Sequence, residues 1–204
     1  MKKWLIPVII IVVIVFGLYS WAKGVNNKAV TLNENISEAW GNVETSYQRR
    51  NDLIGNLVKT VKGAADFEKS TLEAVITARS KATSVTIDPT NITAEQLNQF
   101  NQAQGGLNSA LSRLLVTVEK YPDLKANENF LKLQDELAST ENQILTARTR
   151  FNEAVKPYNN HIKVFPNNLL AGIFGFTEKA YFKAAEGAEK PVDVEFDFGN
   201  DKPQ

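Results

Sequence analysis

Residues 4–22, WLIPVIIIVVIVFGLYSWA, form an uncharged, almost wholly apolar run, and this run restricts the fold more than any other feature of the sequence. As an α-helix rising about 1.5 Å per residue it extends about 28 Å, which matches the hydrocarbon core of a bilayer. Lysines precede it, and Trp4, Tyr19 and Trp21 stand where aromatic residues mark the membrane interface. We therefore predict that residues 1–23 are a transmembrane anchor that contacts the lipid bilayer through residues 4–22.

The run has a second interpretation, a cleaved signal peptide, because Ser20-Trp21-Ala22 offers a small-x-small cleavage site after a basic start. An uncleaved single-pass anchor is favoured, since the run is long for a signal peptide and continues directly into helix-compatible sequence. Lysines lie on both sides of the run, so they do not fix its orientation. A short basic start before a long domain favours a bundle on the periplasmic or extracellular side of the inner (cytoplasmic) membrane.

Composition excludes several classes of function. The 23 basic and 23 acidic residues balance, so no global charge attracts nucleic acid. The chain has no cysteine and a single histidine, His161, which rules out thiolate metal sites and any pair of imidazoles within one chain. No phosphate-binding glycine loop and no Gly-x-Ser-x-Gly motif is present. We expect no catalytic residue, no metal, no cofactor and no nucleic-acid partner.

A heptad pattern follows the apolar run and contains no proline as far as residue 65. Apolar or aromatic side chains recur every three or four residues, which predicts a helix face packed against other helices. One position in the series is charged. The series is Ile36, Trp40, Val43, Tyr47, Arg50, Ile54, Leu57 and Val61.

Three further helices are predicted after a break near Gly63. The second starts at about residue 66 and ends before a loop at residues 84–93; the third starts at Ala94, because Thr93 and Gln96 fit a capping box. Pro122 ends the third helix, and the fourth runs from about residue 128 to 161, where Pro157 should kink it or end it four or five residues early. The predicted fold is all-α, with a long antiparallel four-helix bundle over residues 24–165.

Residues 166–204 differ in kind from the bundle. The stretch NLLAGIFGF, residues 168–176, is too short to span a bilayer and suits a cap over the bundle end or a membrane-surface contact, with core packing favoured. The tail from Glu186 is acidic and alternates apolar with charged residues between 192 and 198. This alternation permits a partner-binding strand, but a frayed acidic terminus is the favoured interpretation.

Several separate blocks of residues between 25 and 176 resemble the LemA family. That resemblance implies an N-terminal membrane anchor and an antiparallel four-helix bundle, and it implies no established reaction. Gly55 and Phe151 depart from the family pattern, where proline and tyrosine are common. The blocks are Trp40, residues 49–54, 56–58, 60–63, 121–127, 133–134, 136–137, 140–142, Ile144, residues 147–148, 158–159 and 165–166.

Polar residues inside the predicted bundle are the candidate site. A charged layer that fixes helix register is favoured over a ligand or partner site. His161 could act as a general base, but a histidine at a helix end more often complements the helix dipole. The layer comprises Arg49, Arg50 and Asp52 on the first bundle helix and Glu141, Asn142 and Arg148 on the fourth.

These features favour a membrane-anchored interaction or scaffold module of the bacterial envelope, which binds a protein partner or associates with itself. The alternatives are a ligand-sensing four-helix bundle and an accessory factor of an envelope protease, or an unrecognised hydrolase. The sequence names neither the partner nor any ligand.

Overall fold

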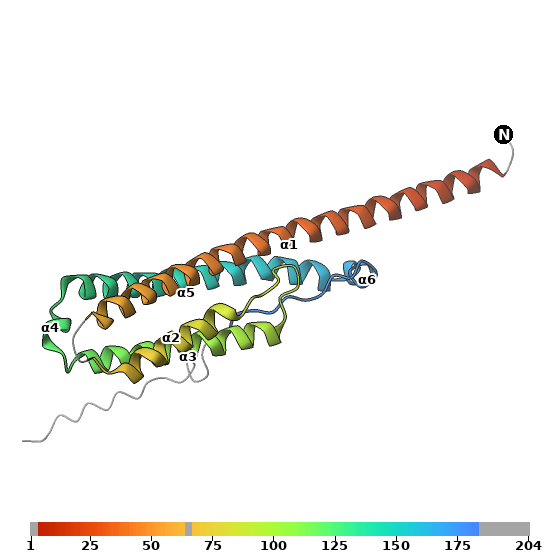
Figure 1. Ribbon diagram of the computed structural model, residues 1–204. Coiled ribbons are helices and arrows are strands. Elements are labelled where there is room, and N and C mark those ends of the chain that lie inside the picture. Colours follow the sequence, from red (N-terminus) through yellow and green to blue (C-terminus); the bar gives the residue numbers. More distant parts are fainter. Residues whose placement is uncertain (1–3, 64–66, 184–204) are drawn as a thin grey trace, which may run out of the picture.

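The computed structural model describes residues 4–63 and 67–183. Helix α1, Leu5–Lys62, is continuous through the apolar run and the heptad, and its first part extends well beyond the other helices (Figure 1). Its only proline, Pro7, lies in the first turn, where the missing N–H would have no helical partner. The helix ends where the Gly63 N–H donates to the carbonyls of Lys59 and Thr60.

Five more helices follow, and no strand occurs in the two described ranges. They are α2 Lys69–Ser84, α3 Ala94–Val118, α4 Pro122–Lys125, α5 Glu128–Lys163 and α6 Asn167–Ile173. The predicted start of α3 is confirmed: the Thr93 hydroxyl accepts from the Gln96 N–H at 3.2 Å, and the Gln96 side chain accepts from the Thr93 N–H at 3.0 Å. Asn127 caps α5 in a similar way, by accepting from the Phe130 N–H.

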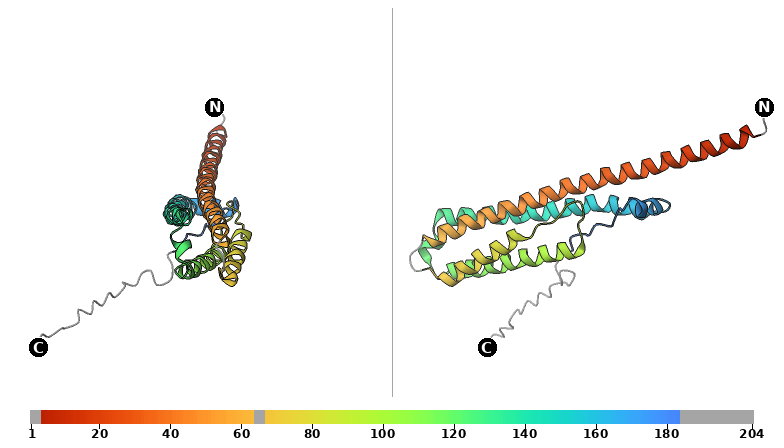
Figure 2. Two further views of the ribbon diagram at one scale, coloured as in Figure 1. Left: turned by 60° about the vertical axis from the view of Figure 1, so that its left-hand side comes forward. Right: turned by 45° about the vertical axis from the view of Figure 1, so that its right-hand side comes forward.

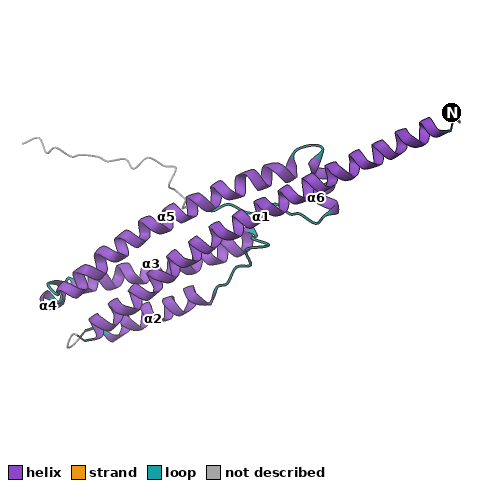
Figure 3. Ribbon diagram, turned by 90° about the horizontal axis from the view of Figure 1, so that it is seen from above, coloured by secondary structure: helices purple, strands orange, loops and turns teal. Residues whose placement is uncertain are grey.

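The helices pack into one elongated region, here called the packed region, which begins at Val25 of α1. Helix α1 lies along α5, α2 lies along α3, and α1 also contacts α2 (Figure 2). Seen from above, α6 and the projecting part of α1 lie at the same end (Figure 3). The buried side chains form two clusters, one around Trp40 toward α6 and one around Leu57 toward α4.

The heptad predicted for α1 is confirmed, since all eight of its members are buried, including the charged Arg50. The buried face of α3 comprises Leu97, Phe100, Gln104, Leu107, Leu114 and Val118, and Leu111 beside it is half-buried. On α2 the buried face is narrow: Leu72, Val75 and Ala82 are buried, whereas Ile76 is 52% exposed. Short α2 contacts fewer helices than α1 does, so a smaller part of its surface is covered.

Pro157 does not end α5 early, contrary to one of the two outcomes predicted for it. The helix continues to Lys163. Proline removes one hydrogen bond, but the turn after it is held by tertiary contacts: Tyr158 and Ile162 are buried, and Asn159 bonds to the backbone of a distant segment. Packing therefore outweighs the local penalty.

The apolar run is exposed from residue 4 to residue 20. An 18-residue window of α1 has a mean hydropathy of 2.6 and none of it is buried, so this helix is long and apolar enough to cross a membrane. Trp4 is 80% exposed and Tyr19 65%, while Trp21 is half-buried. The predicted tail from Glu186 lies outside the described residues.

Candidate functional site

Arg50 is the centre of the polar layer and is 1% exposed. Its Nη1 donates to Glu141 Oε1 at 3.0 Å and to Asn108 Oδ1 at 2.9 Å, and its Nη2 donates to Gln104 Oε1. The guanidinium also lies 4.9 Å from the ring centroid of Tyr47. A buried cation is costly unless its donors are paired, and these contacts offset most of that cost.

The layer links four helices. Arg50 comes from α1, Gln104 from α3 and Glu141 from α5, and the Gln104 Nε2 donates to the carbonyl of Ala82 on α2 at 3.3 Å. The Nε of Arg50 has no hydrogen-bond partner among the described residues. Because each helix contributes at one height only, sliding any of them along its axis would break these bonds.

The six predicted site residues do not all meet in one layer. The structure brings Arg50 and Glu141 together. Asp52 turns to the surface, where it accepts from Gln48 at 3.2 Å and lies 3.9 Å from Arg79 Nη2 of α2. Arg49 and Asn142 are exposed and lie outside the layer.

Arg148 serves a different contact from the predicted one. Its Nη2 donates to the Lys183 carbonyl at 3.1 Å, and its guanidinium lies 4.6 Å from the Phe182 ring centroid. Its positive charge also acts on the Tyr47 hydroxyl. Burial raises the pKa of Tyr47, and the positive charges of Arg148 and Arg50 oppose that rise without cancelling it.

Gln104 and Asn108 are members of the layer that the sequence did not assign to it. Gln104 was visible as the one polar position in the heptad of α3, as Arg50 was in the heptad of α1. Two polar residues on core faces are good candidates to pair, since each would otherwise be buried without a partner. Asn108 is exposed and carried no such signal.

A second feature, also missed from the sequence, is an extended segment over residues 177–183 held against α5. The side chain of Asn159 donates to the Lys179 carbonyl at 2.8 Å and accepts from the Lys179 N–H at 2.9 Å. Asn152 makes the same pair of bonds with Phe182, both at 2.9 Å. Seven helical residues and three extended residues both cover about 10 Å, so the two asparagines match the segment's spacing.

This segment completes the aromatic core. Phe182 stacks on Trp40 with ring centroids 6.0 Å apart, and its ring also lies 5.4 Å from that of Phe151. On its other side, the Ala180 N–H donates to the Ile92 carbonyl, which ties the segment to the loop before α3. The segment therefore fills the space between α5 and the start of α3.

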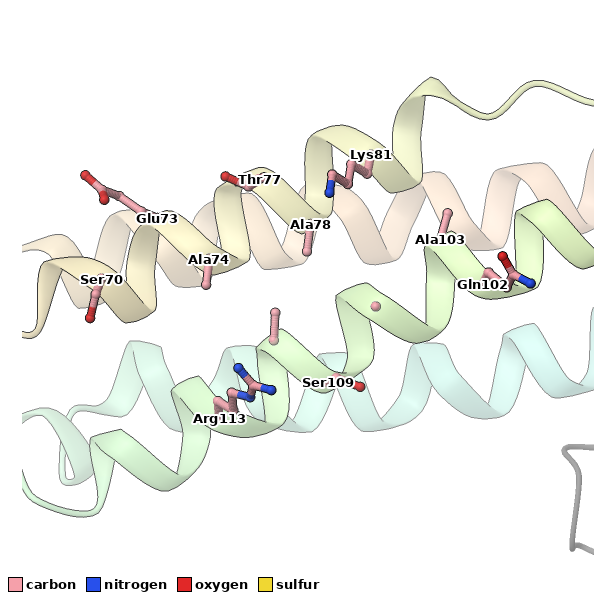
Figure 4. Close-up of a pocket in the computed structure, with 12 residues that line it drawn as sticks. Ser70, Glu73, Ala74, Thr77, Ala78, Lys81, Gln102, Ala103, Ser109 and Arg113 are labelled. Atoms are coloured by element: carbon pink, nitrogen blue, oxygen red, sulfur yellow. The ribbon is translucent and has the colours of Figure 1, made fainter.

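Surface grooves lie elsewhere. The larger one, of about 710 Å³, runs between α2 and α3 and is floored by small side chains, with Lys81, Glu73 and Arg113 at its edges (Figure 4). A second groove borders Gly55 and Arg79. Arg50 lines neither of them. Within residues 4–63 and 67–183, no three histidine or carboxylate side chains are grouped to hold a metal ion.

A family model and individual known proteins each match most of this chain. A family model described as the LemA family matches residues 39–196. Magnetosome protein MamQ 2 of Paramagnetospirillum magneticum is 30% identical over 183 residues, which cover 81% of this chain and 67% of that protein. Protein LemA of Metamycoplasma hominis is 26% identical over 171 residues, which cover 84% of this chain and 74% of that protein.

Proposed function

We propose that this chain, which belongs to the LemA family, is a membrane-anchored antiparallel four-helix bundle that binds or scaffolds another protein of the bacterial envelope. We assign it no catalytic role. The anchor is single-pass in the inner membrane, and the bundle lies on the periplasmic or extracellular side. Protease accessibility in spheroplasts tests this topology: cleavage of the bundle only after the outer membrane is removed is expected, and protection there would contradict it.

The observation that carries the proposal is the continuity of α1. One helix supplies both the uncovered apolar run and the central packed face of the bundle, so there is no linker between membrane and bundle. A helix of this kind holds the bundle at a fixed distance from the end of the span. Such rigidity suits a protein that presents a surface at a defined height.

The groove between α2 and α3 is the surface that we propose to meet a partner. Ala74 and Ala78 of α2 and Ala103 and Gly106 of α3 line it, and small side chains let a third helix approach closely. No described helix covers this groove. The edges carry both signs of charge, which suits pairing with a helix of mixed charge.

The polar layer around Arg50 has a separate proposed role, that of setting helix register. Neither groove reaches it, and its bonds run between helices, so its expected contribution is to the shape of the bundle.

Photocrosslinking in intact cells tests the interaction. A photoreactive amino acid replaces Thr77 in the groove, and the matched control replaces Thr149, an exposed threonine on α5. Adducts with one envelope protein or with a second copy are expected from position 77 and not from 149. If neither position yields an adduct, or both yield the same background, the scaffold proposal is wrong.

A further inference from the structure

Exposed apolar side chains concentrate in one short stretch of the packed region. Residues 164–177 contain no charged side chain. Within this stretch Phe165 is 80% exposed, Leu169 58% and Ile173 77%. The large exposed apolar side chains in the rest of the packed region stand singly, as is normal for a protein surface. A cluster of this kind marks a surface that something else covers.

The cluster is built by the short helix α6 and the turn before it. One side of α6 faces inward, where Ala171 is buried and Leu170 is half-buried. The opposite side carries Leu169 and Ile173, four residues apart and therefore on one face. Helix α6 also contacts α1, so its orientation is fixed by the packed region.

The position of α6 along α1 indicates what covers this apolar cluster. His161 Nε2 lies 3.0 Å from the carbonyl of Val25, and the Asn167 side chain donates to the His161 carbonyl at 3.1 Å. The start of α6 is thus level with Val25. Val25 is the third residue after Ala22, where the uncharged run ends, which corresponds to about 4.5 Å of helix. Figure 1 shows α6 at the end of the packed region from which α1 projects.

The geometry points to α6 and the preceding turn as a second membrane contact, which inserts Phe165, Leu169 and Ile173 into the interface of the bilayer that α1 spans. This inference rests on the proposed membrane anchor. An exposed apolar face at this depth can be buried at the boundary between the headgroups and the acyl chains. A second copy or a soluble partner would have no reason to match the height at which the span ends.

Two membrane contacts, one from α1 and one from α6, restrict the orientation of the bundle more than a single span does. A single spanning helix can tilt and rotate in the bilayer. With α6 also seated in the interface, the face of the bundle that carries the α2–α3 groove keeps one direction relative to the membrane plane.

The experiment uses the full chain, which has no cysteine, reconstituted in vesicles of phosphatidylcholine with a minor fraction of phosphatidylglycerol. Single-cysteine variants Leu169→Cys and Ile173→Cys carry an environment-sensitive fluorophore. Val116→Cys, 69% exposed on α3, is the matched water-facing control, and Val12→Cys reports on the span. Fluorescence is quenched in separate samples by iodide in the water and by spin-labelled lipid.

Labels at positions 169 and 173 are expected to be quenched by spin-labelled lipid and to be about threefold less sensitive to iodide than the label at 116. If positions 169 and 173 respond like 116 while position 12 is quenched by lipid, the anchor stands and this inference is overturned. Protection from both quenchers would mean that protein covers α6, which also overturns it. Failure of lipid quenching at position 12 would refute the anchor itself. Unchanged circular dichroism verifies folding of each variant.

Discussion

Arg50 and Gln104 form a pair whose energetic coupling can be measured by a double-mutant cycle. Arg50→Met removes the buried cation but leaves the Gln104 Oε1 without its donor, in a residue only 4% exposed. An orphaned buried acceptor costs about 1–3 kcal/mol. Gln104→Leu removes one of the partners of a buried charge, a hydrogen bond worth about 1.5–3 kcal/mol. Both single variants are therefore expected to be less stable than the wild type.

The double variant is expected to recover most of the loss. With both polar groups replaced by apolar ones, neither member of the pair leaves the other without its partner. The Ala82 carbonyl loses one bond of 3.3 Å from Gln104, and Glu141, 45% exposed, remains accessible to water. Replacing a buried ionic group by apolar side chains is often neutral or stabilising. The double variant should therefore lie within about 1 kcal/mol of the wild type, equivalent to about 2–4 °C in Tm for a chain of this size.

Thermal unfolding of the full chain in detergent micelles, followed by far-UV circular dichroism, gives the four values. Lys69→Met is the matched control, because it removes a cation whose side chain is 87% exposed and whose ion pair among residues 4–63 and 67–183 is with Glu73, one helical turn away. That change should shift stability by less than about 0.5 kcal/mol. If the two layer substitutions are instead additive within about 0.5 kcal/mol, the pair is not coupled and the reasoning fails.

Three further outcomes follow from particular contacts. Asn159→Ala removes two backbone bonds to Lys179 and should cost about 1–3 kcal/mol, with faster amide exchange at Lys179 by mass spectrometry as the specific readout. Pro157→Ala restores an N–H that can donate within α5 and should raise stability by up to about 3 kcal/mol; a loss would mean that the proline shapes the helix. For Tyr47, burial raises the folded pKa above the unfolded value of 10.0, so the folded state binds more protons and stability falls as pH rises from 10.0 through the raised pKa. Tyr47→Phe should flatten that alkaline decline in urea titrations, and an unchanged slope would contradict the assignment.

Periodicity predicted the faces of the long helices because burial of an apolar stripe is a local property of each sequence segment. The eight residues at heptad spacing between Ile36 and Val61 are all buried. Their spacing alone predicts this, without knowledge of where the other helices lie. The relative height of two helices is not local in this way. Arg50 could be assigned to the core from its own helix, but its contacts with Gln104 and Asn108 depend on where α3 lies along α1.

The extended segment could not be predicted because no periodic signal specifies it. Residues 177–183 have neither helical nor strand alternation, and their backbone groups are paired by asparagine side chains rather than by a neighbouring strand. A spacing of seven between Asn152 and Asn159 places both on one face of α5, but from sequence alone an asparagine there is equally compatible with a hydrogen bond to water. Phe182 lies in the core because the bonds from Asn152 and Asn159 fix the position of the segment.

The distance between the span and α6 offers the last prediction. Inserting seven charged helix-forming residues after Ala22 adds two turns to α1, so the rotation of the packed region is nearly kept while its height rises by about 10.5 Å. Charged side chains resist entry into the hydrocarbon core, so the span itself stays in place. A fluorophore at position 169 should then lose its quenching by lipid, while one at position 12 keeps it. If quenching at 169 survived the insertion, α6 would reach the bilayer without the spacing set by α1, and the rigid coupling inferred from that continuous helix would be wrong.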